Sequence, residues 1–246
     1  MRIWSFPSFY PYNISNKKWN GIFSHRQNLA LKENGVDVEV IHPVVYKYPF
    51  PLDLVFKNVD IENSRNYPRM RHMDGIRIHH PIIPDPRPNR FFKKSFQQRY
   101  IESIVYFFQH NNVKLSEEDV FYAQWIPDAG LVLKAAKKLG VRCGVLVIGD
   151  DVTVYPYKSV KTKSFFIDTI INADIRFSVS KSLVEEANII IKKNLKFNIV
   201  RRGVEYDNFK PVPNVEKQNI RSSLGFSDKD KIIICVGSSI RRKGWI

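Results

Sequence analysis

The sequence has little cysteine, no long uncharged apolar run and no low-complexity tract. Its two cysteines, Cys143 and Cys235, lie in apolar segments without CxxC spacing, so we exclude a disulfide scaffold and expect two buried, reduced thiols. No uncharged run is long enough to span a bilayer, and residues 1–12 lack the small-residue cleavage site of a secretion signal. We therefore expect a cytoplasmic protein whose contact with a membrane can only be peripheral, on the inner face of the cell membrane.

Motifs of several enzyme classes are also missing. No G-x-S-x-G nucleophile elbow is present, which leaves a hydrolase triad without support. The six histidines show no ligand spacing, and His79 and His80, as neighbours in a strand, would point to opposite faces. We therefore expect no metal ion and no other cofactor.

The composition is that of a basic globular protein. Hydrophobic residues make up 43% of the 246 residues, enough for one large α/β core. The net charge of +15 favours an anionic partner, such as nucleic acid, anionic lipid headgroups or a phosphorylated substrate. No aromatic and basic signature of a nucleic-acid-binding strand is present, so we expect no nucleic-acid partner. The local basic clusters are either solvated faces or a functional surface: Lys158/Lys161/Lys163, Lys192/Lys193/Lys196 and Arg201/Arg202.

Apolar strand-like segments alternate with helix-like segments, which predicts an α/β fold with a doubly wound, mainly parallel Rossmann-like sheet. A helix over Gly21 to Glu33, ended by Asn34-Gly35, separates the first two strands. We interpret Leu52 to Arg71 and Pro81 to Pro88 as surface excursions from the sheet. The predicted strands are Arg2 to Ser5, Val36 to Ile41, Ile76 to His80, Val120 to Ala123, Arg142 to Ile148, Ile175 to Val179 and Phe197 to Val200.

Two further helices have clear patterns. One carries large apolar residues at four-residue spacing: Phe92, Phe96, Tyr100, Ile104 and Phe108. This helix either faces the core or lies as a basic amphipathic helix on a membrane surface. The other begins after Ser180, a good N-cap, and runs through Lys193 with Leu183, Ala187, Ile190 and Ile191 inward.

Near the carboxyl end, the pattern is that of a phosphate-binding turn. The apolar run Ile232 to Val236 predicts a buried strand, and the small residues Gly237 to Ser239 and the basic residues Arg241, Arg242 and Lys243 follow it. Backbone N–H groups and a helix dipole converge at such turns, where α/β proteins bind phosphates. We expect a domain over 1–209, a linker over 210–230, and over 231–246 the first part of an incomplete second domain.

Taken in order, these landmarks resemble the family-4 glycosyltransferases of the GT-B fold. The resemblance covers essentially the whole chain, as that family's amino-terminal acceptor-binding domain and the first strand and turn of its nucleotide-sugar-binding domain. The segments that carry it are WSFPSFYPYN, WNGIFSHRQNLALKENGVDVEVIHP, DGIRIHHP, VFYAQWIPDAG, VLVIGDDV, ADIRFSVSKSL, VRRGVEYDNFKP and CVGSSIRRKGW.

The resemblance implies that the intact protein transfers a sugar, without a metal and with retention of configuration, from a nucleotide-diphosphate-sugar donor to a glycan or lipid-linked acceptor in bacterial polysaccharide or glycolipid assembly. It implies donor-phosphate contacts at Gly21, Gly237, Arg242 and Lys243. It implies acceptor contacts at Asn20, Trp125, Gly149 and Asp150, and a catalytic role for Asp151. In this chemistry the protein mainly positions the reactants and stabilises charge on the departing diphosphate.

The sequence departs from the family pattern at several of these positions. Asn20-Gly21 stands where the family often has two glycines, Ser238 where it has an arginine, and Tyr122 and Ile148 where relatives carry histidines. Gly21 is either a phosphate-approaching glycine or one that only begins a helix, and Lys243 is either a diphosphate ligand or part of a solvated basic turn.

Two functional interpretations stay open. The first is a glycosyltransferase fragment that is inactive by itself, because the family's carboxyl-terminal motif with two glutamates is absent. The second is a non-catalytic module that binds an anionic glycolipid or membrane surface.

Overall fold

The computed structural model describes residues 1–11, 21–47, 68–85, 94–111, 113–227 and 229–236. The chain divides into two units, Met1–Arg202 and Gly203–Ile246. The predicted domain boundary after residue 209 stays a prediction, and each unit is described by itself.

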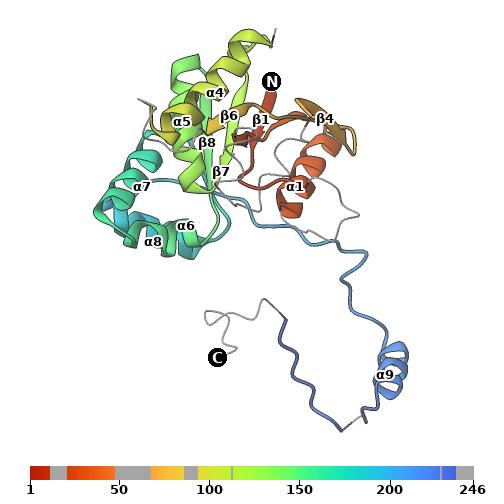
Figure 1. Cartoon of the computed structure of the whole chain (residues 1–246). Coiled ribbons are helices and arrows are strands. Elements are labelled where there is room, and N and C mark those ends of the chain that lie inside the picture. The colour runs from red at the N-terminus through yellow and green to blue at the C-terminus, as the bar shows by residue number, and fades with distance from the viewer. Residues whose placement is uncertain (12–20, 48–67, 86–93, 112, 228, 237–246) are drawn as a thin grey trace. The chain divides into compact units, whose positions relative to one another are not determined.

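The described part of unit 1 is organised around an eight-stranded sheet with the order β10-β9-β8-β7-β1-β2-β5-β4 (Figure 1). All neighbours in it are parallel except β4, which runs antiparallel to β5. The strands are β1 (Arg2–Phe6), β2 (Asp37–Ile41), β4 (Met70–Met73), β5 (Ile76–His79), β7 (Val120–Gln124), β8 (Arg142–Val147), β9 (Ile175–Ser178) and β10 (Asn198–Ile199). The seven strands predicted for this sheet are confirmed, as is the mainly parallel α/β class.

Two predicted surface excursions contain regular structure instead. β4 overlaps the end of the segment Leu52 to Arg71 and forms a hairpin with β5. β6 (Ile82–Asp85) falls within Pro81 to Pro88 and pairs in parallel with β3 (Val44–Lys47) as a separate two-stranded sheet. Prolines made the strand improbable from sequence, yet Pro84 is tolerated because this small sheet has only edges.

The helices cover both faces of the large sheet. Their bounds are α1 (Ile22–Glu33), α4 (Phe96–His110), α5 (Ile126–Leu139), α6 (Asp150–Thr153), α7 (Val160–Asn172) and α8 (Lys181–Ile191), with a 3₁₀ turn, η3, at Tyr155–Tyr157 and α9 (Asn214–Ser223) in unit 2. Trp4 and Phe6 of β1 join the main core with α4 and α5. Val40 and Ile78 join a smaller cluster with Leu29 of α1, so α1 lies on the opposite face.

The helix patterns are confirmed where they are described. On α4, Ile104 and Phe108 are buried and Tyr100 packs against the same core, so this helix faces the core. Phe96, the first residue of the helix, is an exception, because it is 40% exposed. Phe92 lies outside the described residues. On α8, the Ser180 hydroxyl accepts a hydrogen bond from the Leu183 N–H at 3.3 Å. The four residues predicted to face inward on α8 are buried.

Two predictions for the carboxyl-terminal segment are wrong. Ile232 to Val236 form no strand and are exposed, with Ile233 95% exposed, and Cys235 is exposed rather than buried. An apolar segment forms a strand only if its backbone N–H and C=O groups pair with a neighbouring strand. The described residues of unit 2 include no strand that could pair with this segment. The prediction that Cys143 is buried is confirmed.

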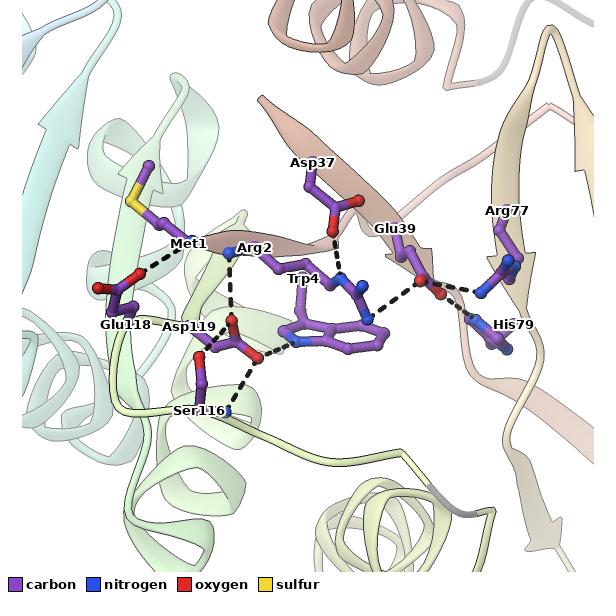
Figure 2. A network of polar contacts seen from close by, with 10 residues as sticks. All are labelled: Met1, Arg2, Trp4, Asp37, Glu39, Arg77, His79, Ser116, Glu118 and Asp119. Atoms are coloured by element: carbon purple, nitrogen blue, oxygen red, sulfur yellow. Dashed lines mark hydrogen bonds and ion pairs between the residues drawn. The ribbon is translucent and has the colours of Figure 1, made fainter. Parts of the chain in front are cut away.

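A polar network fixes the amino-terminal ends of the central strands (Figure 2). Asp119, just before β7, accepts hydrogen bonds from the Arg2 N–H at 3.1 Å and the Trp4 indole N–H at 3.3 Å, both on β1. Its carboxylate also accepts from the Ser116 N–H and hydroxyl. Burial raises the pKa of Asp119, but these donors outweigh it and hold the pKa below its ordinary value.

Glu39 of β2 is the second centre of this network (Figure 2). It accepts a 2.6 Å hydrogen bond from His79 and lies 3.1 Å from Arg77 and 3.3 Å from Arg2. Burial opposes the charged form, yet the His79 hydrogen bond and the Arg77 charge keep the pKa of Glu39 below its ordinary value. The two acids thus join β1 to β2, β5 and β7.

Candidate functional site

The order of the strands places a switch point between β1 and β7. From β1 the chain continues outward through β2 and β5, and it later returns to the other side of β1 with β7, β8 and β9. In open parallel sheets, ligands bind beyond the carboxyl ends of the strands at such a switch point. The candidate site is therefore built from the residues that follow β1, β7 and β8.

Gly21 lies at the start of α1, and its backbone requires glycine. Its φ is +82°, and a Cβ at this position would lie 2.4 Å from the Phe9 carbonyl oxygen and 2.6 Å from the Tyr10 Cα. The α1 N-terminus has no side-chain cap and no acidic residue in its first turn. Gly21 thus allows close packing of two backbone segments beside an uncapped positive helix end.

A chain of hydrogen bonds links α1 to β7 at this edge. Gln124 accepts from the Ser24 hydroxyl at 2.7 Å and donates to Gln27 Oε1 at 3.1 Å. Gln27 in turn donates to the Tyr122 hydroxyl at 2.9 Å, and Ser8 donates to the Gln124 carbonyl. Burial raises the pKa of Tyr122 to about 12, so its hydroxyl stays protonated at neutral pH.

The sequence analysis did not single out this polar chain. Tyr122 and Gln124 share a strand face by the two-residue period, and Ser24 and Gln27 share a helix face at three-residue spacing. These spacings were the only sequence signal that the four polar side chains could lie on facing surfaces. The contact itself depends on the pairing of β1 with β7, which the sequence pattern does not specify.

Trp125 ends β7 in a backbone conformation that is rare for a side-chain-bearing residue. Its φ is +69° and its ψ is 109°. The Trp125 N–H donates to the Leu146 carbonyl at 3.2 Å, and its own carbonyl accepts from Asp128 and Ala129 in the first turn of α5. Such strain persists only where the surroundings fix it, and it concentrates at functional sites.

The turn after β8 is held together by Asp151. Asp151 is fully buried, and its carboxylate accepts from the N–H groups of Gly149 at 2.7 Å, Ile148 at 3.0 Å and Ile126 at 3.4 Å. Burial raises the pKa of Asp151, against the opposing effect of these donors. The carboxylate that we expected to act on an acceptor therefore faces the backbone of its own turn and of the α5 start. Gly149 and Asp150 are half-buried at the same edge.

In the first turns of α1, the buried His25 is the centre of a Tyr-His-Asp chain whose aspartate is exposed. The ring of His25, 1% exposed, meets the Tyr10 hydroxyl at 2.7 Å through Nδ1 and the Asp74 carboxylate at 2.8 Å through Nε2. Tyr10 is also the residue whose Cα approaches Gly21. This chain joins α1 and the β4–β5 turn to the loop that packs on Gly21.

The structure places five of the nine predicted site residues, all at the carboxyl ends of the parallel strands: Gly21, Trp125, Gly149, Asp150 and Asp151. The other four lie outside the described residues: Asn20, Gly237, Arg242 and Lys243. Within the described ranges, no group of three His, Cys, Asp or Glu side chains is arranged to hold a metal ion. No helix in the described part of the chain is long and apolar enough to cross a bilayer.

No protein-family model and no curated protein sequence matches the chain. Among solved structures, it is similar to a sucrose-phosphate synthase from Thermosynechococcus elongatus, with a TM-score of 0.60 at 16% identity over 99% of this chain and 57% of that one. A second structure of that synthase gives a TM-score of 0.50 at 12% identity, over 91% of this chain and 99% of that one. An E. coli structure named for trehalose-6-phosphate and bound with UDP-2-fluoro glucose gives a TM-score of 0.50 at 9% identity. This match covers 92% of this chain and 55% of that one.

This chain thus spans 57% and 55% of the two longer neighbours. At these identities the likeness establishes the fold alone. The expected fold, a Rossmann-like domain of the GT-B type, is confirmed, and the neighbours that share it are glycosyltransferases. Membership of family 4 stays a prediction.

Proposed function

We propose that this chain is the acceptor-side part of a glycosyltransferase that moves a sugar from a nucleotide-diphosphate donor to a glycan or lipid-linked acceptor in bacterial polysaccharide or glycolipid assembly. The observation that carries the proposal is the switch point between β1 and β7, in a fold shared with a sucrose-phosphate synthase over 99% of this chain. Gly21 stands at the start of the helix that follows β1, and Trp125 directly follows β7. The UDP-2-fluoro glucose bound to the E. coli neighbour supports a nucleotide-sugar donor.

On the donor side, we assign the approach of the diphosphate to the Gly21 turn. The first turn of α1 has no side-chain cap, and an uncapped helix N-terminus attracts anions through its backbone N–H groups and its dipole. The missing Cβ of Gly21 lets the Phe9–Tyr10 backbone pack against this turn. Gly237, Arg242 and Lys243 remain proposed partners for the same phosphates, since a lysine or arginine neutralises a departing diphosphate.

On the acceptor side, we assign hydroxyl recognition to Trp125, Gly149 and Asp150, together with the Tyr122 hydroxyl. Gln27 already donates to the Tyr122 oxygen, so the Tyr122 O–H is left to donate to a ligand oxygen. Asp151 acts through the turn that it organises, and its direct role in catalysis remains a proposal that its buried geometry does not favour. We propose a metal-independent reaction with retention of configuration.

Saturation-transfer NMR with the 246-residue chain tests the assignment. We expect signals from short oligosaccharides or a lipid-linked saccharide, and weaker signals from UDP-glucose and GDP-mannose. Gln27→Leu and Tyr122→Phe should weaken saccharide signals, because each removes one member of the hydrogen-bonded chain at nearly constant shape. Gln109→Leu, the same change at an exposed position of α4, is the control. Absence of any saccharide or nucleotide-sugar signal would contradict the proposal.

We further propose that the 246-residue chain does not turn over nucleotide sugars by itself, because it spans only 57% and 55% of the two longer neighbours. The measurement is release of nucleoside diphosphate from a panel of nucleotide sugars with an acceptor present. Turnover at a rate typical of transferases, on the order of 1 s⁻¹ or more, would show that this part of the fold suffices. Saccharide binding with no donor binding would instead favour a binding module.

A further inference from the structure

A stretch of sequence with exposed apolar and basic side chains follows directly on the Gly149 turn. Val154, Tyr157 and Val160 are 43%, 59% and 88% exposed. Three exposed lysines belong to the same stretch, Lys158, Lys161 and Lys163. We call these six residues the η3–α7 patch, and we propose that it docks on an anionic lipid bilayer.

The patch is held in a defined conformation. Ser159 caps α7: its hydroxyl accepts from the Thr162 N–H at 3.1 Å, and Thr162 Oγ1 accepts from the Ser159 N–H at 3.0 Å. Pro156 is buried, and the Tyr157 hydroxyl donates to Glu186 on α8. The exposed position of Val160 is therefore fixed by a cap on one side and a buried proline on the other, so its exposure is a property of the fold.

The charges of the patch favour an anionic surface over other occupants. None of the three lysines forms an ion pair with a described residue, and Glu186 on α8 accepts a hydrogen bond from Tyr157. A second copy of the chain would bring the same lysines and a net charge of +15, which opposes self-association through this patch. Lysines around a protruding valine and tyrosine fit a bilayer surface, with the rings and methyl groups at headgroup depth.

The location of the patch connects it to the candidate site. α6 begins at Asp150, and η3 and α7 follow it without a break longer than two residues. α6, α7 and α8 lie together at one corner of unit 1 (Figure 1). If the proposed acceptor is lipid-linked, docking through the patch brings the bilayer next to the Gly149 turn. This last step rests on the proposed function, while lipid binding itself does not.

Vesicle sedimentation tests the proposal. We expect the chain to sediment with vesicles of an equimolar mixture of phosphatidylcholine and phosphatidylglycerol and to remain in solution with phosphatidylcholine alone. At about 1 M salt, where the Debye length is about 3 Å, most binding should be lost. Replacing the three lysines by glutamine should lower partitioning about a hundredfold, about fivefold for each lysine.

A matched control separates the patch from the net charge. Glutamine at Lys114, Lys193 and Lys196, three exposed lysines elsewhere in unit 1, changes the net charge equally and should leave most binding intact. Val160→Asp places an acid at the first position of α7, which favours the helix and opposes the bilayer, so it should abolish binding in a folded protein. Equal losses in the two lysine variants, or unchanged binding of Val160→Asp, would overturn the proposal.

Two further outcomes are distinguishable. Sedimentation velocity of the protein alone would show a concentration-dependent dimer, lost in Val160→Asp, if a second copy occupied the patch, and this too would overturn the proposal. Vesicle binding without saccharide or nucleotide-sugar binding would support the patch and contradict the proposed function. Saccharide binding without vesicle binding would support the proposed function and contradict the lipid-docking patch.

Discussion

At the scale of single residues, backbone geometry determines which glycines of α1 tolerate a side chain. Gly21 and Gly35 are both left-handed glycines, with φ of +82° and +78°, at the two ends of α1. Only Gly21 has neighbouring backbone where a Cβ would stand, whereas nothing lies within 4 Å of that position at Gly35. The two glycines therefore allow the cost of a positive φ to be separated from the cost of a close backbone approach.

We expect Gly35→Ala to lower the free energy of unfolding by about 1 kcal/mol, the cost of a left-handed alanine. Gly21→Ala should cost roughly 2 to 4 kcal/mol, because the Phe9–Tyr10 backbone must also move. Urea denaturation followed by circular dichroism measures both values. Equal losses in the two variants would mean that the Phe9–Tyr10 loop yields freely, and that Gly21 is needed only for its φ.

Asp151 and Asp150 offer a second comparison. Asp151→Asn replaces a carboxylate that accepts three backbone N–H groups by an amide with one acceptor oxygen, so we expect a loss of about 1 to 3 kcal/mol. Asp150→Asn, at the half-buried neighbour, should lower stability less than Asp151→Asn does and should weaken saccharide binding. Denaturation and saturation-transfer NMR on the same two variants distinguish the turn from the ligand contact.

At the scale of elements, local sequence patterns predicted helices whose hydrogen bonds lie within the element. They were less reliable for strands, whose hydrogen bonds depend on a partner that is distant in sequence. The cap of α8 was predicted from Ser180 and is confirmed, while Ser95 and Ser159, which cap α4 and α7, were not singled out in the sequence. β6 was missed because its prolines argue against a strand, and Ile232 to Val236 were wrongly predicted because only their apolar character was visible. For the candidate site, the glycines and Trp125 could be found from sequence, but the Gln27–Gln124 contact required the strand order.

The cap of α7 gives a prediction at this scale. Ser159→Ala removes the acceptor for the Thr162 N–H and should cost about 1 kcal/mol. Ser164→Ala, at an exposed position inside the same helix, should be neutral or slightly stabilising because alanine has the higher helix propensity. Thermal unfolding of the two variants provides the measurement, and a loss in Ser164→Ala as large as that in Ser159→Ala would argue against the cap.

At the scale of the whole molecule, the buried histidines and the acids Glu39 and Asp119 give stability the same dependence on pH, which the raised pKa of Asp151 opposes. His80 donates through Nδ1 to the His42 carbonyl and accepts through Nε2 from Arg71, which suits a neutral ring. Burial lowers the pKa of His80 to about 4 and that of His42 to about 3. The unfolded chain therefore binds more protons below pH 6.5, and stability is lost as the pH falls from about 6.5 toward these values. The lowered pKa values of Glu39 and Asp119 add a further loss at more acidic pH.

His42→Phe tests this account, since it keeps a ring beside His80 and removes one proton-binding group. We expect the slope of unfolding free energy between pH 4 and 6.5 to decrease by up to about 1.4 kcal/mol per pH unit, the value for one proton. His110→Gln, at an exposed position of α4, serves as the control for the loss of one histidine. A wild-type slope near zero in this range would show that both histidines are charged in the folded state.

The central place of β1 has a consequence for how the molecule is made. Ile3 pairs on one side with Val38 and on the other with Val120, so β1 lacks one neighbour after its own translation until β7 has been translated. An unpaired apolar strand is a template for aggregation. Nascent chains of this protein that are arrested before β7 should therefore depend on chaperones, and those extended past β8 should not.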